Sequence, residues 1–131
     1  MTDWLLLLGS NHVDDGPIGD ALEALATIGE VDCLCRRHLP PRSGRGAWYF
    51  NALATLSGDG STSADALRAR LRDIEQRLGR DRDDPQRVHI DIDILALRDE
   101  EWVAEAHAMD KGELEGFPVA MLLAETGLKI R

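Results

Sequence analysis

The chain has 131 residues and a formal net charge of −9. A chain of this length is expected to form one domain, residues 1–131, with a core that needs no disulfide or structural metal. The acidic balance argues against a general nucleic-acid binder, because such proteins carry basic surface that neutralises phosphates. Basic residues are nonetheless clustered around positions 36–45 and 68–87, which is compatible with a small anionic ligand.

The two cysteines and the N-terminal region indicate the compartment. Cys33 and Cys35 are poorly placed to bridge within one strand, and they share no zinc-type spacing with other ligands. We expect both to be reduced, as is typical of a cytoplasmic protein. The apolar run over residues 4–8 is too short to span a bilayer, and no basic segment precedes it. We therefore expect a protein that is neither exported nor bound to membranes.

The first half of the chain predicts three strands and one helix. Residues 3–8 form a continuous apolar run, typical of a buried central strand, and Gly9-Ser10-Asn11 is interpreted as the turn that ends it. A helix is predicted over residues 17–28, with Pro17 at its start and Gly29 as its stop. Residues 31–38 and 47–56 predict two further strands, separated by a loop rich in proline, glycine and arginine.

The second half predicts a helix, a strand and a short final helix. Ser63 or Thr62 caps a helix whose apolar residues share one face and which ends at Gly79. Residues 87–97 predict the fourth strand, residues 98–115 a loop or mobile segment, and residues 117–126 a short helix. This order predicts an α+β fold, a ferredoxin-like sandwich in which helices pack on one face of an antiparallel sheet.

Alternation along residues 87–95 suggests a metal site. In an extended strand Arg87, His89, Asp91 and Asp93 share one face, and the apolar residues between them share the other. Two carboxylates at this spacing can converge on Mg²⁺, which usually takes one or two protein carboxylates and completes its shell with water and phosphates. The alternative is an acidic strand face turned to water. Arginines at positions 80, 82 and 87 favour the phosphate-binding interpretation.

Five motifs in register resemble those of a known family. They are Gly9-Ser10-Asn11, Pro40-Pro41, Tyr49-Phe50-Asn51, Glu75 with Leu78-Gly79-Arg80, and Ile90-Asp91-Ile92-Asp93-Ile94-Leu95. In order and rough spacing they resemble 6-hydroxymethyl-7,8-dihydropterin pyrophosphokinase, which transfers pyrophosphate from ATP to the pterin hydroxymethyl group in folate biosynthesis. The resemblance covers most of the chain through Leu97 and becomes faint after it.

The resemblance implies a role for each matched position. Catalysis would depend on Asp91, Asp93, Arg80 and Arg87, with the two aspartates holding two Mg²⁺ ions that bridge the ATP phosphates and no covalent intermediate. ATP would be bound by Glu75, Arg80, Arg82, Ile94 and His107. The pterin would be bound by Leu39, Pro40, Tyr49, Asn51 and Phe117. The implied partners are these two small molecules, and the expected state is a monomer or weak homodimer.

Alternatives remain open for several of these residues. Asn51 would pair with the pterin edge, while Tyr49 and Phe117 would stack on its ring, but ordinary core packing is an equal alternative for the two aromatic residues. His107 matches a nucleotide-binding histidine, or it is a solvated loop histidine. Gly9-Ser10-Asn11 is assigned to the first turn and left outside the site.

Three positions depart from the family pattern. Val88 stands where the family has an arginine, Leu39 where it has a threonine, and Glu115 where it has an arginine beside the Gly-Phe pair. Arg87 lies one residue from the expected position, and such a slip moves a strand residue to the other face. A glutamate beside polyphosphate repels it. We expect these departures to weaken turnover more than binding.

Two other functions therefore remain as alternatives. The second function, after pyrophosphoryl transfer, is that of a divergent homologue that binds a pterin or nucleotide with little or no pyrophosphokinase activity, or that acts on a related heterocyclic alcohol. The third function is that of an interaction module whose acidic strand is only a solvated face. Asp91 and Asp93 with nearby arginines separate the first two functions from the third, and the arginine-poor segment 99–115 separates the first from the second.

Overall fold

The computed structural model describes residues 2–40, 45–79 and 89–131. The strands are β1 (Asp3–Ser10), β2 (Glu30–Leu39), β3 (Tyr49–Ser57), β4 (Asp91–Arg98) and β5 (Trp102–Ala104), and the helices are α1 (Gly16–Ala26), α2 (Ala64–Arg77), α3 (Ala106–Lys111) and α4 (Val119–Thr126). The strands form one sheet in the order β2-β3-β1-β4-β5, and each neighbouring pair is antiparallel. The first six elements have the predicted ferredoxin-like order and topology.

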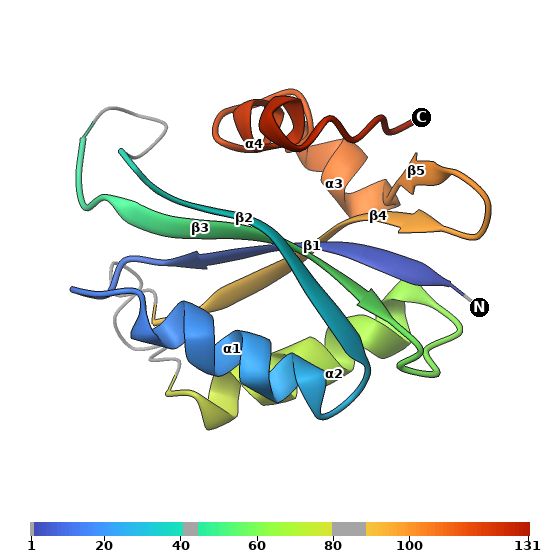
Figure 1. The fold of residues 1–131 in the computed structure, drawn as a ribbon, viewed down its shortest axis with the longest axis horizontal. Helices are drawn as coiled ribbons and strands as arrows, with labels where there is room; N and C mark the ends of the chain where they lie inside the picture. The colour runs from blue at the N-terminus through green and yellow to red at the C-terminus, as the bar shows by residue number, and fades with distance from the viewer. Residues whose placement is uncertain (1, 41–44, 80–88) are drawn as a thin grey trace.

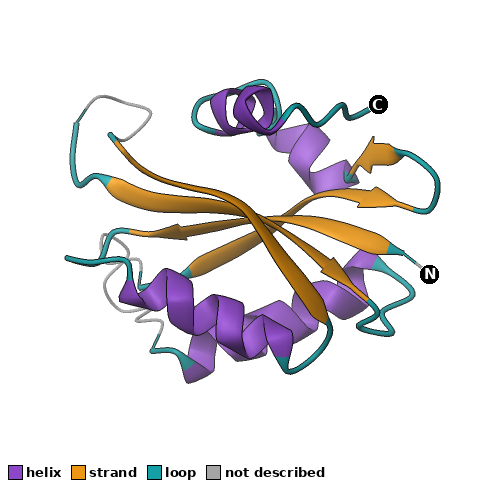
Figure 2. Ribbon diagram, viewed as in Figure 1, coloured by secondary structure: helices purple, strands orange, loops and turns teal. Residues whose placement is uncertain are grey.

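Helices cover both faces of this sheet. Helices α1 and α2 pack on one face and α3 and α4 on the other (Figure 1), so the sheet is the middle layer of three (Figure 2). The predicted layer of helices on one face corresponds to α1 and α2, and the structure adds a second layer opposite it. None of the described helices is long and apolar enough to cross a membrane, since α2, the longest, has 14 residues.

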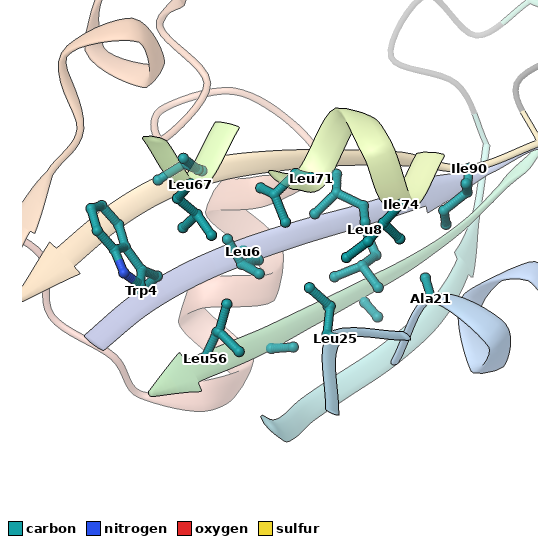
Figure 3. Close-up of a cluster of buried hydrophobic side chains, with 14 of the residues drawn as sticks. Trp4, Leu6, Leu8, Ala21, Leu25, Leu56, Leu67, Leu71, Ile74 and Ile90 are labelled. Carbon is teal, nitrogen blue, oxygen red and sulfur yellow. The ribbon is translucent and has the colours of Figure 1, made fainter. Parts of the chain in front are cut away.

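The larger core lies between the sheet and the α1/α2 layer (Figure 3). Alternate residues of β1, including Leu6 and Leu8, point into it, and they meet Leu25 of α1 and Leu71 of α2. Ile90, together with Ile92 and Ile94 of β4, is buried in the same core. The predicted alternation is therefore correct over residues 90–94, because Asp91 and Asp93 must point to the opposite face of the sheet.

The ends of two predicted strands differ from the structure. Strand β1 does not stop at a turn but continues through Gly9 and Ser10, which pair with Asn51 and Phe50 of β3. Strand β4 begins only at Asp91, and residues 87 and 88 lie outside the described residues. The turn assigned to Gly9-Ser10-Asn11 was wrong because the strand pairing satisfies the backbone of Gly9 and Ser10, and Ser10 is fully buried.

The segment predicted as a loop, residues 98–115, contains β5 and α3. Trp102 of β5 is buried in the second core, on the α3/α4 side of the sheet. The carboxylate of Glu105 caps α3 by accepting hydrogen bonds from the backbone N–H groups of His107 and Ala108, and Gly112, with φ of 66°, ends the helix. The loop prediction was wrong because tertiary contacts and caps stabilise this short helix without an apolar period.

Both cysteines lie on the edge strand β2 as free thiols, and their reduced state in the cell stays a prediction. An irregularity in the pairing of β2 with β3 falls between Cys33 and Cys35. Burial raises the pKa of both thiols above the ordinary value. The thiols are therefore mostly protonated near neutral pH, which makes them weak nucleophiles.

Candidate active site

A cavity of about 570 Å³ lies along the outer edge of β4. Strand β5 pairs only with residues 96–98 of β4, so the earlier part of that edge faces the cavity instead of a described strand. Helix α2 lines the cavity from one layer and α3 from the other. The structure brings five predicted site residues into its wall, namely Glu75, Asp91, Asp93, Ile94 and His107. We call this the β4-edge cavity.

Asp91 and Asp93 form a pair of carboxylates that share one face of β4 and the wall of this cavity. Burial, followed by the negative charges of Asp91 and Glu113, raises the pKa of Asp93 to about 7. The charge of Lys111 acts in the opposite direction. An acid whose ionisation is opposed by its neighbours gains from a bound proton or a bound cation, so this pair is suited to a divalent metal ion.

The residues present fit Mg²⁺ that arrives with a polyphosphate. Within the described residues, no group of three or more His, Cys, Asp or Glu side chains is arranged to hold a metal ion. Mg²⁺ does not need such a group, because it retains waters and uses one or two carboxylates together with substrate phosphates. Asp91 and Asp93 supply that number of carboxylates, and the cavity in front of them leaves space for phosphate and water.

Glu75 joins α2 to the exposed edge of β4. Its side chain is buried, and Oε2 accepts a hydrogen bond of 2.9 Å from the backbone N–H of Ile92. That N–H belongs to the part of the strand edge that β5 does not cover. Glu75 therefore satisfies a strand donor that the fold leaves without a ladder partner, and it holds the helix against the strand at the cavity wall.

A second polar link connects α2 to α3 at the cavity. The guanidinium of Arg68 lies 3.1 Å from Oε1 of Glu105, and Nδ1 of His107 lies 3.4 Å from the same oxygen. Burial alone would raise the pKa of Glu105, but hydrogen bonds from His107 and Ala108 and the charge of Arg68 hold it below its ordinary value. His107 is thus neither a loop residue nor distant from the cavity, although its side chain is largely solvent-exposed.

Three of the residues predicted to bind the pterin, Leu39, Tyr49 and Asn51, lie at neighbouring positions of β2 and β3 on the α3/α4 face of the sheet. Leu39 pairs with Tyr49, and Nδ2 of Asn51 donates a 3.1 Å hydrogen bond to the backbone carbonyl of Tyr49. Pro40 follows Leu39 and is exposed. Phe117 lies two residues before α4, the helix that contacts β2 on this face, and is 37% exposed. Full burial in the core therefore does not account for Phe117.

Gly9 connects the carboxylate pair to this second group. In β1 it pairs with Asp91 on one side and with Asn51 on the other, so all three residues face the same way. A Cβ atom at Gly9 would lie 3.9 Å from Oδ1 of Asn51 and from Cδ2 of Tyr49. Its φ is not positive, so the backbone does not require glycine there. Gly9 therefore separates Asp91 from the buried Asn51 without placing a side chain between them.

Sequence reasoning missed Gly9 and several charged residues of the β4-edge cavity. Arg68 and Arg72 lie one turn apart on α2, and Glu75 follows at the next helical interval, a spacing that could have identified both arginines. Lys111 and Glu113 come from the segment that was predicted to be a loop, where no periodic signal marked them.

The remaining predicted residues are distributed differently. Arg80, Arg82 and Arg87, together with Val88, lie outside the described residues. Glu115, expected to oppose phosphate in place of a family arginine, lines a separate cavity of about 410 Å³ beside α3, Leu123 and the C-terminal residues. Glu115 is therefore not part of the wall of the β4-edge cavity, where Lys111 is present instead.

Comparison with known proteins gives one family. The model of the family described as 7,8-dihydro-6-hydroxymethylpterin-pyrophosphokinase (HPPK) matches residues 5–122. This span includes the wall of the β4-edge cavity, Gly9 and the Tyr49–Asn51 end of β3. No curated protein matches the chain.

Proposed function

Because the chain belongs to the 7,8-dihydro-6-hydroxymethylpterin-pyrophosphokinase family, whose activity is pyrophosphoryl transfer in folate biosynthesis, we propose that it transfers pyrophosphate from ATP to 6-hydroxymethyl-7,8-dihydropterin. The observation that carries the proposal is the row Asp91, Gly9, Asn51 across three neighbouring strands. Strand spacing puts the outer two Cα atoms of this row roughly 10 Å apart. The carboxylate pair and the amide of Asn51, which is suited to a heterocycle edge, thus point to the same face of the sheet.

The nucleotide would occupy the β4-edge cavity. Bound at Asp91 and Asp93, Mg²⁺ would neutralise phosphate charge and polarise the transferred group. Arg68 and Arg72 offer positive charge from α2, and Ile94 offers apolar surface. By the family resemblance, Arg80, Arg82 and Arg87 would add further phosphate contacts, and Glu75 and His107 would lie beside the nucleotide. Positioning and charge stabilisation supply most of the catalysis in such transfers.

The pterin would lie on the surface beside Gly9. Asn51 offers amide donors and an acceptor to its edge, with Tyr49 against its ring and Leu39 and Pro40 at its rim. Phe117 would cover the ring from the α4 side. In the reaction, the hydroxymethyl oxygen of the pterin attacks the β-phosphorus of ATP, and the bond from that phosphorus to the α–β bridging oxygen breaks. AMP departs with the electron pair of this bond, and the hydroxyl proton is released to solvent.

A homologue that binds these ligands without turnover is less well supported. That alternative was based on the lack of arginines in segment 99–115 and on Glu115. Glu115 lines a different cavity, so it is not in the wall that phosphate would contact at the Asp91 and Asp93 pair. The cationic residue that this segment does contribute to the cavity is Lys111.

The proposal is tested by incubating purified protein with ATP, Mg²⁺ and the dihydropterin. We expect AMP to accumulate in proportion to pterin consumed, and to disappear when the pterin is omitted. Asp91→Ala and Asp93→Ala should each abolish AMP release, because Mg²⁺-ATP loses its anchor. Absence of AMP from the wild-type protein at high concentration would reject the proposed function.

A further inference from the structure

Lys111 is the last residue of α3 and lines the β4-edge cavity. Its Nζ lies 3.6 Å from Oε1 of Glu113, and 60% of its side chain is exposed. Its charge reaches Asp93, whose pKa it lowers against the raising effects of Asp91 and Glu113. Lys111 is therefore a positive charge on a flexible stem, close to the carboxylate pair but not tightly fixed by it.

The layer from which Lys111 approaches distinguishes it from the two arginines of the cavity. Asp91 and Asp93 point to the α3/α4 side of the sheet, whereas Arg68 and Arg72 extend from α2 on the other side. Of these two arginines, Arg68 reaches the α3 side of the cavity, where its guanidinium is bound to Glu105 and lies 3.3 Å from Nδ1 of His107. Lys111 adds a cation from the side to which the aspartates point.

The ion pairs that these cations form also differ in strength. Arg68 is held by Asp65 at 2.7 Å and by the buried Glu105 at 3.1 Å. The ion pair of Lys111 with Glu113 is longer and partly exposed, and pairs of this kind contribute about 0–1 kcal/mol. A phosphate oxygen forms a stronger, charge-assisted hydrogen bond with an ammonium group. Lys111 can exchange partners at little cost, whereas Arg68 cannot.

We propose that Lys111 is a phosphate-binding residue, which leaves Glu113 and contacts the nucleotide phosphates when Mg²⁺ and nucleotide bind at Asp91 and Asp93. The inference depends on the proposed function, since it assigns a role within the same site. Glu113 acts as the resting partner of the ammonium, so the lysine is held near the cavity before the nucleotide arrives.

The lysine content of the chain permits a direct footprint. The chain has two lysines, Lys111 and Lys129, and Lys129 lies beside Arg98 and Trp102 at a different cavity. The probe is α,β-methylene-ATP, in which a methylene group replaces the bridging oxygen of the bond to be broken. The protein is acetylated at a low reagent dose in the presence of Mg²⁺ and this analogue, and the acetylation of each lysine is quantified by mass spectrometry. We expect bound analogue to slow Lys111 acetylation about tenfold. Lys129 should be unaffected, and adenosine without phosphates should protect neither lysine.

Binding calorimetry with the same analogue gives the second readout. Lys111→Ala should weaken binding about tenfold or more, Lys111→Arg should remain within about threefold of wild type, and Lys129→Ala should match wild type. If wild type binds the analogue but Lys111 is neither protected nor needed, the role of Lys111 is rejected and the proposed function stands. If wild type does not bind the analogue, both are rejected.

Discussion

Asp93 is the residue at which the acid-base behaviour of the site is most strongly altered. Its pKa of about 7 in the folded protein, due first to burial and then to Asp91, compares with an ordinary value of 3.8. Between these values the folded protein keeps a proton that the unfolded chain has released. The metal-free folded state therefore loses stability relative to the unfolded chain as the pH rises from about 4 to above 7.

Asp93→Asn should remove this pH dependence of the free energy of unfolding, because the amide has no proton to lose. We expect the variant to be more stable than metal-free wild type at pH 8 by on the order of 2 kcal/mol, with the difference nearly gone at pH 4. Urea unfolding at the two pH values in the presence of EDTA measures it. The exposed Asp73→Asn serves as control. An Asp93→Asn variant less stable than wild type at pH 8 would contradict the assignment.

Substitution of Gly9 tests where the pterin binds. Gly9→Val should fold, because the site is extended strand and a Cβ there meets only ordinary contacts at 3.9 Å. The branched side chain would occupy the surface of β1 between Asp91 and Asn51. We expect pterin affinity to fall about tenfold or more while affinity for Mg²⁺ with α,β-methylene-ATP stays within about threefold. Calorimetry with each ligand measures this, and unchanged pterin affinity would show that the pterin does not lie over Gly9.

At the scale of elements, β5 and α3 are the parts that the sequence did not reveal. Strands β1 to β4 and helices α1, α2 and α4 were predicted because apolar period, glycine and proline marked them. Helix α3 has six residues and is capped by a glutamate, which is not among the preferred N-cap residues. The contributions of Lys111 and His107 to the cavity follow from this helix, so they could not be derived from local pattern alone.

Glu105 should control the stability of that element. Glu105→Ala removes the cap of α3 and the buried partner of Arg68, so we expect a loss of about 2–3 kcal/mol in the free energy of unfolding. Asp65→Ala removes the exposed partner of the same arginine and should cost less than about 1 kcal/mol. Urea denaturation compares the two, and equal losses would rule out a special role for the α2 to α3 link.

At the scale of the whole molecule, topology assembles the site. The strand order brings β4 and β3 to either side of β1, so residues 40 positions apart in sequence, Asp91 and Asn51, flank Gly9. The alternation of β4 predicted the face of Asp91, whereas Gly9 was assigned to a turn, so its place between Asp91 and Asn51 was not predicted. The position of the second helical layer was not predictable, because its contacts with the sheet are tertiary and the pattern of α3 is weak. The carboxylate pair was therefore found from sequence, and most of the charges around it were not.

The central claim is that a pyrophosphoryl group moves from ATP to the pterin hydroxyl, and ³¹P NMR of the complete reaction tests it most directly. The account predicts the signals of AMP and of a pterin diphosphate ester rising together, with neither formed in EDTA. Formation of ADP with a pterin monophosphate, or hydrolysis of ATP without a phosphorylated pterin, would contradict it.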